Sequence, residues 1–293
     1  MGDDDATTGA SGKAALPELF EFSMCKGSCM VDPKYPFTSW ALANIFMSTP
    51  WPTVDQEIVQ GGHRFYVVPQ RGDSFPAVAL ERTDLVAIEE DYSLIARFLS
   101  SIAWLSEGRI AVFSFGGCSR RPTPLVGFSR HSQNFMPYFK GRFAVSELPS
   151  LSEDQHLALA FWREGCNLEF ASPHYAVLSF FKILERAFPE GKERGLFVSR
   201  GLTTIPSAAP YYKAGAMQEI AAIQAEGCEI GEYLRSSCRC AVAHGGNRHP
   251  ASNPDNANEE GRLRRALPIL KMLAYICMTD EMAIPEPRKF RLA

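Results

Sequence analysis

The chain lacks the features of exported, membrane-spanning and strongly basic proteins. Residues 1–13 include three consecutive aspartates and small polar residues, without the basic start and apolar stretch of a secretory signal. The most apolar stretch near the end, 267–278, is interrupted by Pro268 and Lys271 and is shorter than the roughly 20 residues that cross a bilayer. The net charge of −3 means that a nucleic acid would need a local basic patch. We therefore expect a cytoplasmic protein that does not enter a membrane.

Several motifs of common enzyme classes are also missing. The sequence has no phosphate-binding loop, nucleophile elbow, pair of catalytic carboxylates or histidine-rich metal set, so we expect neither a cofactor nor a metal. The eight cysteines are predicted to be free thiols of a reducing compartment. An alternative is that Cys25, Cys29, Cys238 and Cys240 bind zinc, but neither pair has the two-residue spacing of zinc knuckles.

The composition indicates a folded chain of two domains. With 293 residues, 46% hydrophobic and 22% charged, the chain is long enough for two ordinary cores. Residues 1–13 are predicted to be a disordered tail, because small polar residues bury too little surface to offset the entropy of ordering. We expect a β-rich domain at 14–149 and a helical domain at 150–293, which together make an α+β fold.

Short strands punctuated by glycine and proline are predicted in the first domain. The segments rich in Val, Ile and Phe are 65–68, 77–80, 110–115 and 125–128. One helix is expected between them, because apolar residues recur at helical spacing from Tyr92 to Leu105 and Gly108 can end the helix.

Helical periods dominate after residue 150. Ser152 is a candidate N-cap, because two acidic residues follow it and suit the positive end of a helix dipole. The predicted helices span about 152–163, 173–188, 216–225, 230–243 and 259–278.

The end of the fourth of these helices carries the most informative pattern in the chain. Arg239 and His244 lie five positions apart, and Gly245 and Gly246 follow. On a continuous ideal helix the two side chains would point about 140° apart. Glycine after the last turn permits a left-handed conformation, so His244 could turn back toward Arg239.

Such a pair suits cleavage of RNA without a metal. The 2′-hydroxyl of RNA can attack the adjacent phosphate if protons are transferred and the charge on the transition state is stabilised. Histidine titrates near neutral pH, and the arginine guanidinium matches a phosphate. The C-terminal end of a helix also favours imidazolium, which suits an acid.

Three segments resemble the HEPN superfamily. The sequence RCAVAHGG at 239–246 resembles its Arg-x4-6-His motif, 172–188 resembles the aromatic helix that precedes the motif, and 259–276 is similar to the closing helix. The resemblance implies a helical bundle. It also implies either an RNase of a toxin or antiviral defence system, dimeric through the helical domain, or an inactive relative that binds or scaffolds. The whole-chain layout is similar to the MauJ-like proteins named for methylamine-utilisation clusters.

The resemblance and the residues together lead to two function hypotheses. The first is a metal-independent endoribonuclease with Arg239 and His244 as catalytic residues and Glu185 orienting Arg239. The second is a non-catalytic accessory or scaffold protein. It is favoured by Cys240. This position is commonly Asn, Asp or His in the motif, and a thiol forms only weak hydrogen bonds. Whether the chain is an enzyme is thus left open.

Alternatives also exist for the individual residues. Arg239 could instead form a salt bridge with Glu185 or Glu232, and His244 could bind carbonyls at the helix end. The cluster of Arg262, Arg264 and Arg265 could hold RNA phosphates or form a solvated face.

Overall fold

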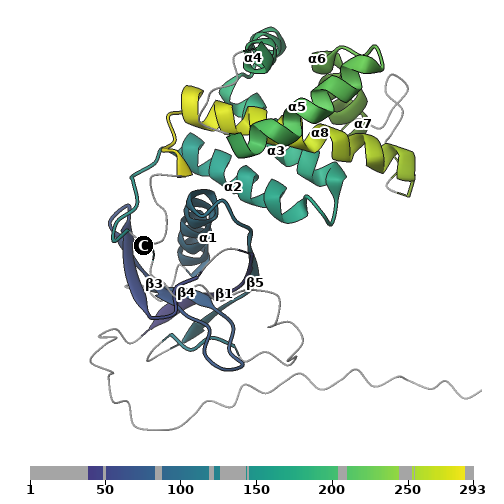
Figure 1. Cartoon of the computed structure of the whole chain (residues 1–293). Helices are drawn as coiled ribbons and strands as arrows, with labels where there is room; N and C mark the ends of the chain where they lie inside the picture. The colour runs from purple at the N-terminus through teal and green to yellow at the C-terminus, as the bar shows by residue number, and fades with distance from the viewer. Residues whose placement is uncertain are drawn as a thin grey trace, which may run out of the picture. The chain divides into compact units, whose positions relative to one another are not determined.

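The computed structural model describes residues 39–48, 51–82, 88–118, 122–125, 143, 145–203, 210–243, 253 and 255–287. The predicted tail at 1–13 lies outside these residues. Within them an antiparallel five-stranded sheet is followed by a series of helices, so the predicted α+β fold class is confirmed (Figure 1).

The sheet has the strand order β2-β3-β4-β1-β5, with antiparallel neighbours throughout. The strands are β1 Trp40–Met47, β2 Gln56–Gln60, β3 His63–Val68, β4 Ala77–Glu81 and β5 Ile110–Cys118. Gly61 and Gly62 join β2 to β3 with φ angles of 57° and 81°, which only glycine adopts easily in so tight a hairpin. The strands predicted at 65–68, 77–80 and 110–115 are confirmed. Leu125 lies outside any strand, and 126–128 lie outside the described residues.

The strands β1 and β2 lie outside the segments predicted from sequence. β1 is almost entirely buried, because it lies between β4 and β5 and carries core residues on both faces. β2 is mostly polar in sequence. Neither strand therefore shows the alternation of apolar and polar residues that marks a half-buried strand.

The helix α1, Ile88–Leu105, packs against one face of the sheet (Figure 1). The rings of Phe65 on β3 and Phe98 on α1 stack with centroids 4.3 Å apart. The predicted helix at 92–105 is confirmed, and it begins four residues earlier than its periodic apolar residues. The left-handed residue after the helix is Glu107, with φ of 50°, rather than the glycine that follows it.

The helices of the second half are α2 Glu153–Leu168, α3 Pro173–Ala187, α4 Gly191–Thr203, α5 Pro210–Ala225, α6 Ile230–Glu232, η2 Tyr233–Cys240, α7 Ala241–Ala243, α8 Ala257–Ile276 and η3 Cys277–Glu281. The two η elements are π-helical, with wider turns than an α-helix. All five predicted helices are confirmed as helical segments. The N-cap at Ser152 is also confirmed, because its side chain accepts from the backbone of Gln155 and Gln155 bonds back to it.

The helix α4 was not predicted, because its glycines resemble helix breakers. The packing explains one of them. A Cβ atom on Gly201 would lie 2.8 Å from Cδ2 of Leu273 on α8, so glycine permits the two helices to approach closely. Phe197 and Val198, on the same side of α4 as Gly201, are also buried. Tertiary contact thus stabilises a helix of weak intrinsic propensity.

Aromatic side chains join α1 to the helices that follow the sheet. Trp104 on α1 lies edge-on to Trp162 on α2, with ring centroids 5.0 Å apart, and it packs at 5.2 Å against Tyr275 on α8. Its indole nitrogen donates to the carbonyl of Pro285 at 2.8 Å. The buried residues therefore form a common core across the predicted boundary near residue 150. That 14–149 and 150–293 are separate domains stays a prediction.

Candidate functional site

The motif arginine lies on a π-helical stretch. The predicted helix at 230–243 is present, but Tyr233–Cys240 is π-helical rather than α-helical. Glu229 starts this segment, because its carboxylate accepts from the amides of Gly231, at 2.8 Å, and Glu232, at 2.5 Å. π-Helical turns are rare and occur frequently at functional sites. The π-helical geometry and the sequence motif therefore indicate the same segment as a candidate functional site.

Arg239 forms an ion pair with Glu185 of α3. Its Nη2 atom lies 2.8 Å from Oε1 of Glu185, and its Nε atom donates to the same oxygen at 3.0 Å. The two side chains are 24% and 29% exposed, so the pair is shielded but open to solvent on one side. Of the two carboxylates considered as partners, Glu185 is the one that binds; Glu232 pairs with Arg235 at 2.6 Å. The contact expected for an orienting role of Glu185 is present, and the role itself stays a prediction.

His244 lies outside the described residues, as do Gly245 and Gly246. The last described residues before it, Ala241–Ala243, are α-helical. That His244 turns back toward Arg239 therefore stays a prediction.

The two cysteines beside Arg239 differ in environment. Cys238 is fully buried, and burial raises the pKa of its thiol to about 12, so it serves as a small apolar core residue at neutral pH. Cys240 is partly exposed. The alternative zinc site cannot be assembled from described residues, because Cys25 and Cys29 lie outside them. Among the residues that are described, no cluster of three or more metal-binding side chains is found.

The predicted basic cluster is divided among different partners. Arg264 pairs with Glu260 at 2.6 Å, and Arg265 pairs with Glu226 at 2.8 Å. Both charges are thus compensated within the protein, in agreement with a solvated face more than with a phosphate site.

Arg262 lies on the side of α8 that faces η2. Its carbonyl accepts from the hydroxyl of Tyr233 at 3.0 Å, and its Nε atom is buried without a hydrogen-bond partner in the described part of the chain. Burial lowers the pKa of the neighbouring His174; the carboxylates of Glu259 and Glu260 oppose this shift, and the charge of Arg262 adds to it. Arg262 is the member of the cluster that lies beside the motif.

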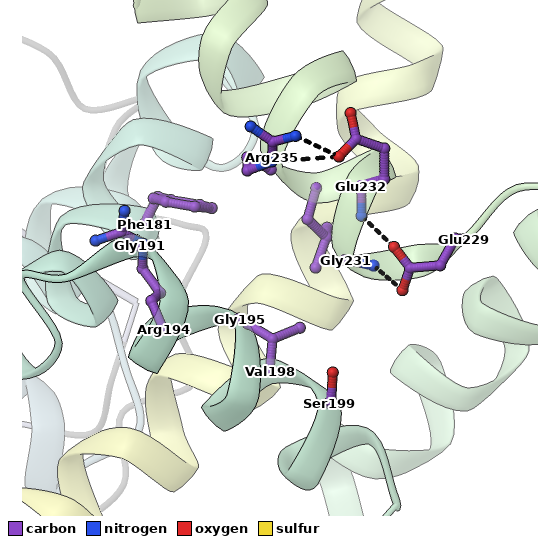
Figure 2. Close-up of a pocket in the computed structure, with 11 residues that line it drawn as sticks. Phe181, Gly191, Arg194, Gly195, Val198, Ser199, Glu229, Gly231, Glu232 and Arg235 are labelled. Atoms are coloured by element: carbon purple, nitrogen blue, oxygen red, sulfur yellow. Dashed lines mark hydrogen bonds and ion pairs between the residues drawn. The ribbon is translucent and has the colours of Figure 1, made fainter.

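A groove of about 360 Å³ lies between α4, α3 and the start of the motif helix. Figure 2 shows Phe181 on its α3 side, Arg194 and Ser199 on α4, and Glu232 with Arg235 opposite. Phe181 precedes Glu185 by four residues and therefore lies one turn away on the same face of α3. Arg235 precedes Arg239 on η2. The groove is thus lined by the same two elements as the ion pair, but the pair itself does not line it.

Most polar groups of the groove already have partners. Nη1 of Arg194 donates to the carbonyl of Phe188 at 2.8 Å, which supports the end of α3. Arg235 and Glu232 bind each other, and the carboxylate of Glu229 caps the motif helix (Figure 2). Sequence reasoning missed Arg194 and Ser199, because α4 was not predicted and no local motif marks them.

Within the described residues, no helix is long and apolar enough to cross a bilayer. Comparison of the chain with curated proteins and with solved structures found no match. A family model matches 158–279, the region from within α2 into η3 that contains both Glu185 and Arg239. The matched family is described as methylamine utilization protein MauJ, and the helical half of this chain is similar to that family.

Proposed function

We propose that the helical half is a HEPN-type, metal-independent endoribonuclease in which Arg239 and His244 act on the scissile phosphate. The observation that supports this most is the position of Arg239. It lies on a π-helical turn, is partly exposed, and forms an ion pair with a carboxylate from a second helix. A guanidinium with a defined orientation costs less entropy to bring to a phosphate than a mobile one does.

In this mechanism the 2′-hydroxyl of RNA gives its proton to solvent, its oxygen attacks the adjacent phosphorus, and the bond from phosphorus to the 5′-oxygen breaks. Arg239 stabilises the added negative charge on the phosphoryl oxygens. His244 transfers the proton that the 5′-oxygen needs in order to leave. Glu185 positions the guanidinium, and the products carry 2′,3′-cyclic phosphate and 5′-hydroxyl ends. We further propose that the protein acts as a dimer through its helical half, on cytoplasmic RNA, in a defence setting.

A second candidate function is a non-catalytic accessory or scaffold role in a methylamine-utilisation setting. The same ion pair favours it, because Glu185 already compensates the positive charge of Arg239 and so leaves less of it to stabilise a phosphate. Arg264 and Arg265 are compensated in the same way. The match to the family of methylamine utilization protein MauJ also favours this alternative. In this role the Arg239–Glu185 pair simply joins α3 to η2.

Cleavage assays separate the two candidates. The purified full chain is incubated with mixed RNA in EDTA beside Arg239→Ala, His244→Ala and the control Arg200→Ala. Arg200 is an ion-paired arginine of α4 whose partner, Glu281, lies in η3 rather than in α3 or the motif helix. An RNase gives cyclic phosphate ends with the wild type and the control, and at least about 100-fold less with either motif variant.

No cleavage by the wild type, or equal cleavage by His244→Ala, contradicts the RNase proposal. The accessory role then makes its own prediction in cells that depend on the protein. Arg239→Ala retains the phenotype, whereas a charge at the exposed apolar Leu196 of α4 abolishes it. The reverse pattern contradicts the accessory role.

A further inference from the structure

The two edges of the sheet are protected very differently. The outer edge of β2 is closed by the chain itself: the amide of Val59 donates to Ser146, and the amide of Leu148 donates to Val59. β2 also carries a charge, Glu57, and is only five residues long. Short, charged and covered strands are the usual protection of a sheet edge.

The opposite edge, β5, has little of this protection. It is nine residues long, and its sequence IAVFSFGGC has neither a charged residue nor a proline. Asn167 of α2 covers its first position by donating to the carbonyl of Ile110 at 2.9 Å. A bulge at Phe113 interrupts the pairing with β1. Beyond these two features, no described element pairs with the outer side of β5.

The register shows which amides of β5 point outward. Ile45 of β1 donates its amide to Pro76, on the β4 side, so its partner across the ladder, Val112, directs its amide away from β1. Ala43 lies two residues from Ile45 and has the same orientation, which makes the amide of its partner Phe115 point outward as well. We call Val112 and Phe115 the outward positions. In the described part of the chain, no hydrogen bond to either amide is found.

Exposed aromatic rings lie at the same edge. Phe113 is 51% exposed and Phe115 is 42% exposed. The ring of Phe113 also contacts Phe46 and Phe75, with centroids 5.1 and 5.0 Å apart, and the ring of Phe115 contacts Tyr92 of α1 at 4.7 Å, so both rings are covered only in part. Large rings are rarely left in water beside an open strand edge unless a partner covers them.

We propose that β5 pairs antiparallel with β5 of a second copy of this chain, so that two five-stranded sheets join into one. The chemistry of the edge selects the occupant. Outward amides and carbonyls need another extended backbone, and the flanking phenylalanines need an apolar, uncharged strand. β5 itself has this composition. A two-fold axis between two copies of β5 places their aromatic residues beside each other, and no charged residue of one strand faces the other strand. The proposal is independent of RNase activity, and its interface differs from a dimer through the helices.

Sedimentation of the full chain over a range of micromolar concentrations tests self-association. Phe113→Glu brings like charges together across the two-fold axis. Val112→Pro removes one outward donor while the inward ladder to β1 stays intact. Each variant is expected to raise the dissociation constant of the step that joins two sheets at least tenfold, which corresponds to about 1.4 kcal/mol. Val54→Glu is the matched control, because Val54 is also apolar and 41% exposed but lies just before β2, at the opposite edge of the sheet from β5. It should leave the constant unchanged.

Amide exchange shows whether backbone pairing is the cause. The amides at the outward positions should exchange slowly at concentrations where the dimer forms and rapidly on dilution, while far-UV circular dichroism shows that the variants remain folded. A wild type that is monomeric throughout, self-association that Phe113→Glu leaves unchanged, or fast exchange at the outward positions in the associated form would each overturn the proposal. Self-association that only Leu196→Glu, on α4, disrupts would place the interface on the helices instead.

Discussion

Nε and Nη2 of Arg239 both bind one oxygen of Glu185, at 3.0 and 2.8 Å, and so join the motif helix to α3. The two residues are 54 positions apart in sequence. The contact holds the candidate RNase motif against the aromatic helix α3. In the RNase hypothesis it positions Arg239 for a phosphate, and in the accessory hypothesis it only joins the two helices.

The Arg239–Glu185 pair should contribute measurably to stability. Both side chains are more than two-thirds buried, so we expect a coupling free energy of about 1 kcal/mol. Urea unfolding of Arg239→Ala, Glu185→Ala and the double variant measures it as a double-mutant cycle. Strictly additive losses would show that the pair does not stabilise the fold, and a role of this contact in joining the helices would then be excluded.

Two glycines of the helical half should respond oppositely to alanine. A Cβ atom on Gly165 of α2 would lie 2.8 Å from the ring of Phe180 on α3, whereas nothing lies within 4 Å of one on Gly195 of α4. We expect Gly165→Ala to lower the free energy of unfolding by about 1–3 kcal/mol through overpacking. Gly195→Ala should raise it by about 0.5–1 kcal/mol, because alanine is the better helix former. Thermal unfolding of both variants checks this, and equal signs would contradict the packing of α2 on α3.

The ion pair of Lys271 with Glu169 should matter more than an exposed pair. The side chains of Lys271 and Glu169 lie 2.8 Å apart and are 17% and 21% exposed. Glu169→Ala leaves an uncompensated charge among apolar neighbours, so we expect a loss of about 3 kcal/mol. Arg97→Ala breaks the pair with Glu153, whose side chains are 42% and 75% exposed, and should cost less than about 1 kcal/mol. Chemical unfolding compares the two, and similar losses would contradict the prediction.

Buried thiols should make the fold less stable at high pH. Burial raises the pKa of Cys238 from its ordinary value of 9.0 to about 12. The unfolded chain then releases this proton above pH 9 while the folded chain keeps it. The contribution to stability is therefore complete below pH 9 and is lost as the pH rises from 9 toward 12.

The size of this effect is about 1 kcal/mol for one thiol at pH 10. Urea unfolding between pH 8 and about pH 10 should show a shallower decline for Cys238→Ala than for the wild type. Cys228→Ala is the control, because Cys228 is exposed and should leave the slope unchanged. Identical slopes in all three proteins would show that Cys238 is not the shielded thiol described above.

Features that depend on neighbouring residues could be predicted from the sequence. The cap at Ser152 and the apolar periods of α1, α3 and α8 are local signals, and the structure contains each of them. The wrong or missing predictions concern elements whose stability comes from distant contacts. β1 is shaped by two neighbouring strands, and α4 is held by the approach of Gly201 to α8.

In the candidate site, too, some features follow from the local sequence and others only from tertiary contacts. Arg239, Glu185 and the turn of helix that carries the motif could be named from sequence, because residue type and spacing mark them. The sequence left two carboxylates as partners of Arg239, and the π-helical winding of η2 has no recognised local signal. Similarly, Arg194 and Ser199 join the groove only because α4 folds beside η2.

By itself, the sequence determined the fold class, most helices and the motif, because hydrophobic period, capping and residue chemistry act over a few residues. Only the tertiary structure decided that Glu185 binds Arg239, that Arg264 and Arg265 are compensated, and that β5 lies at one edge of the sheet formed by the described strands. These depend on which surfaces meet after residues far apart in the chain have packed together, and packing is a property of the whole core.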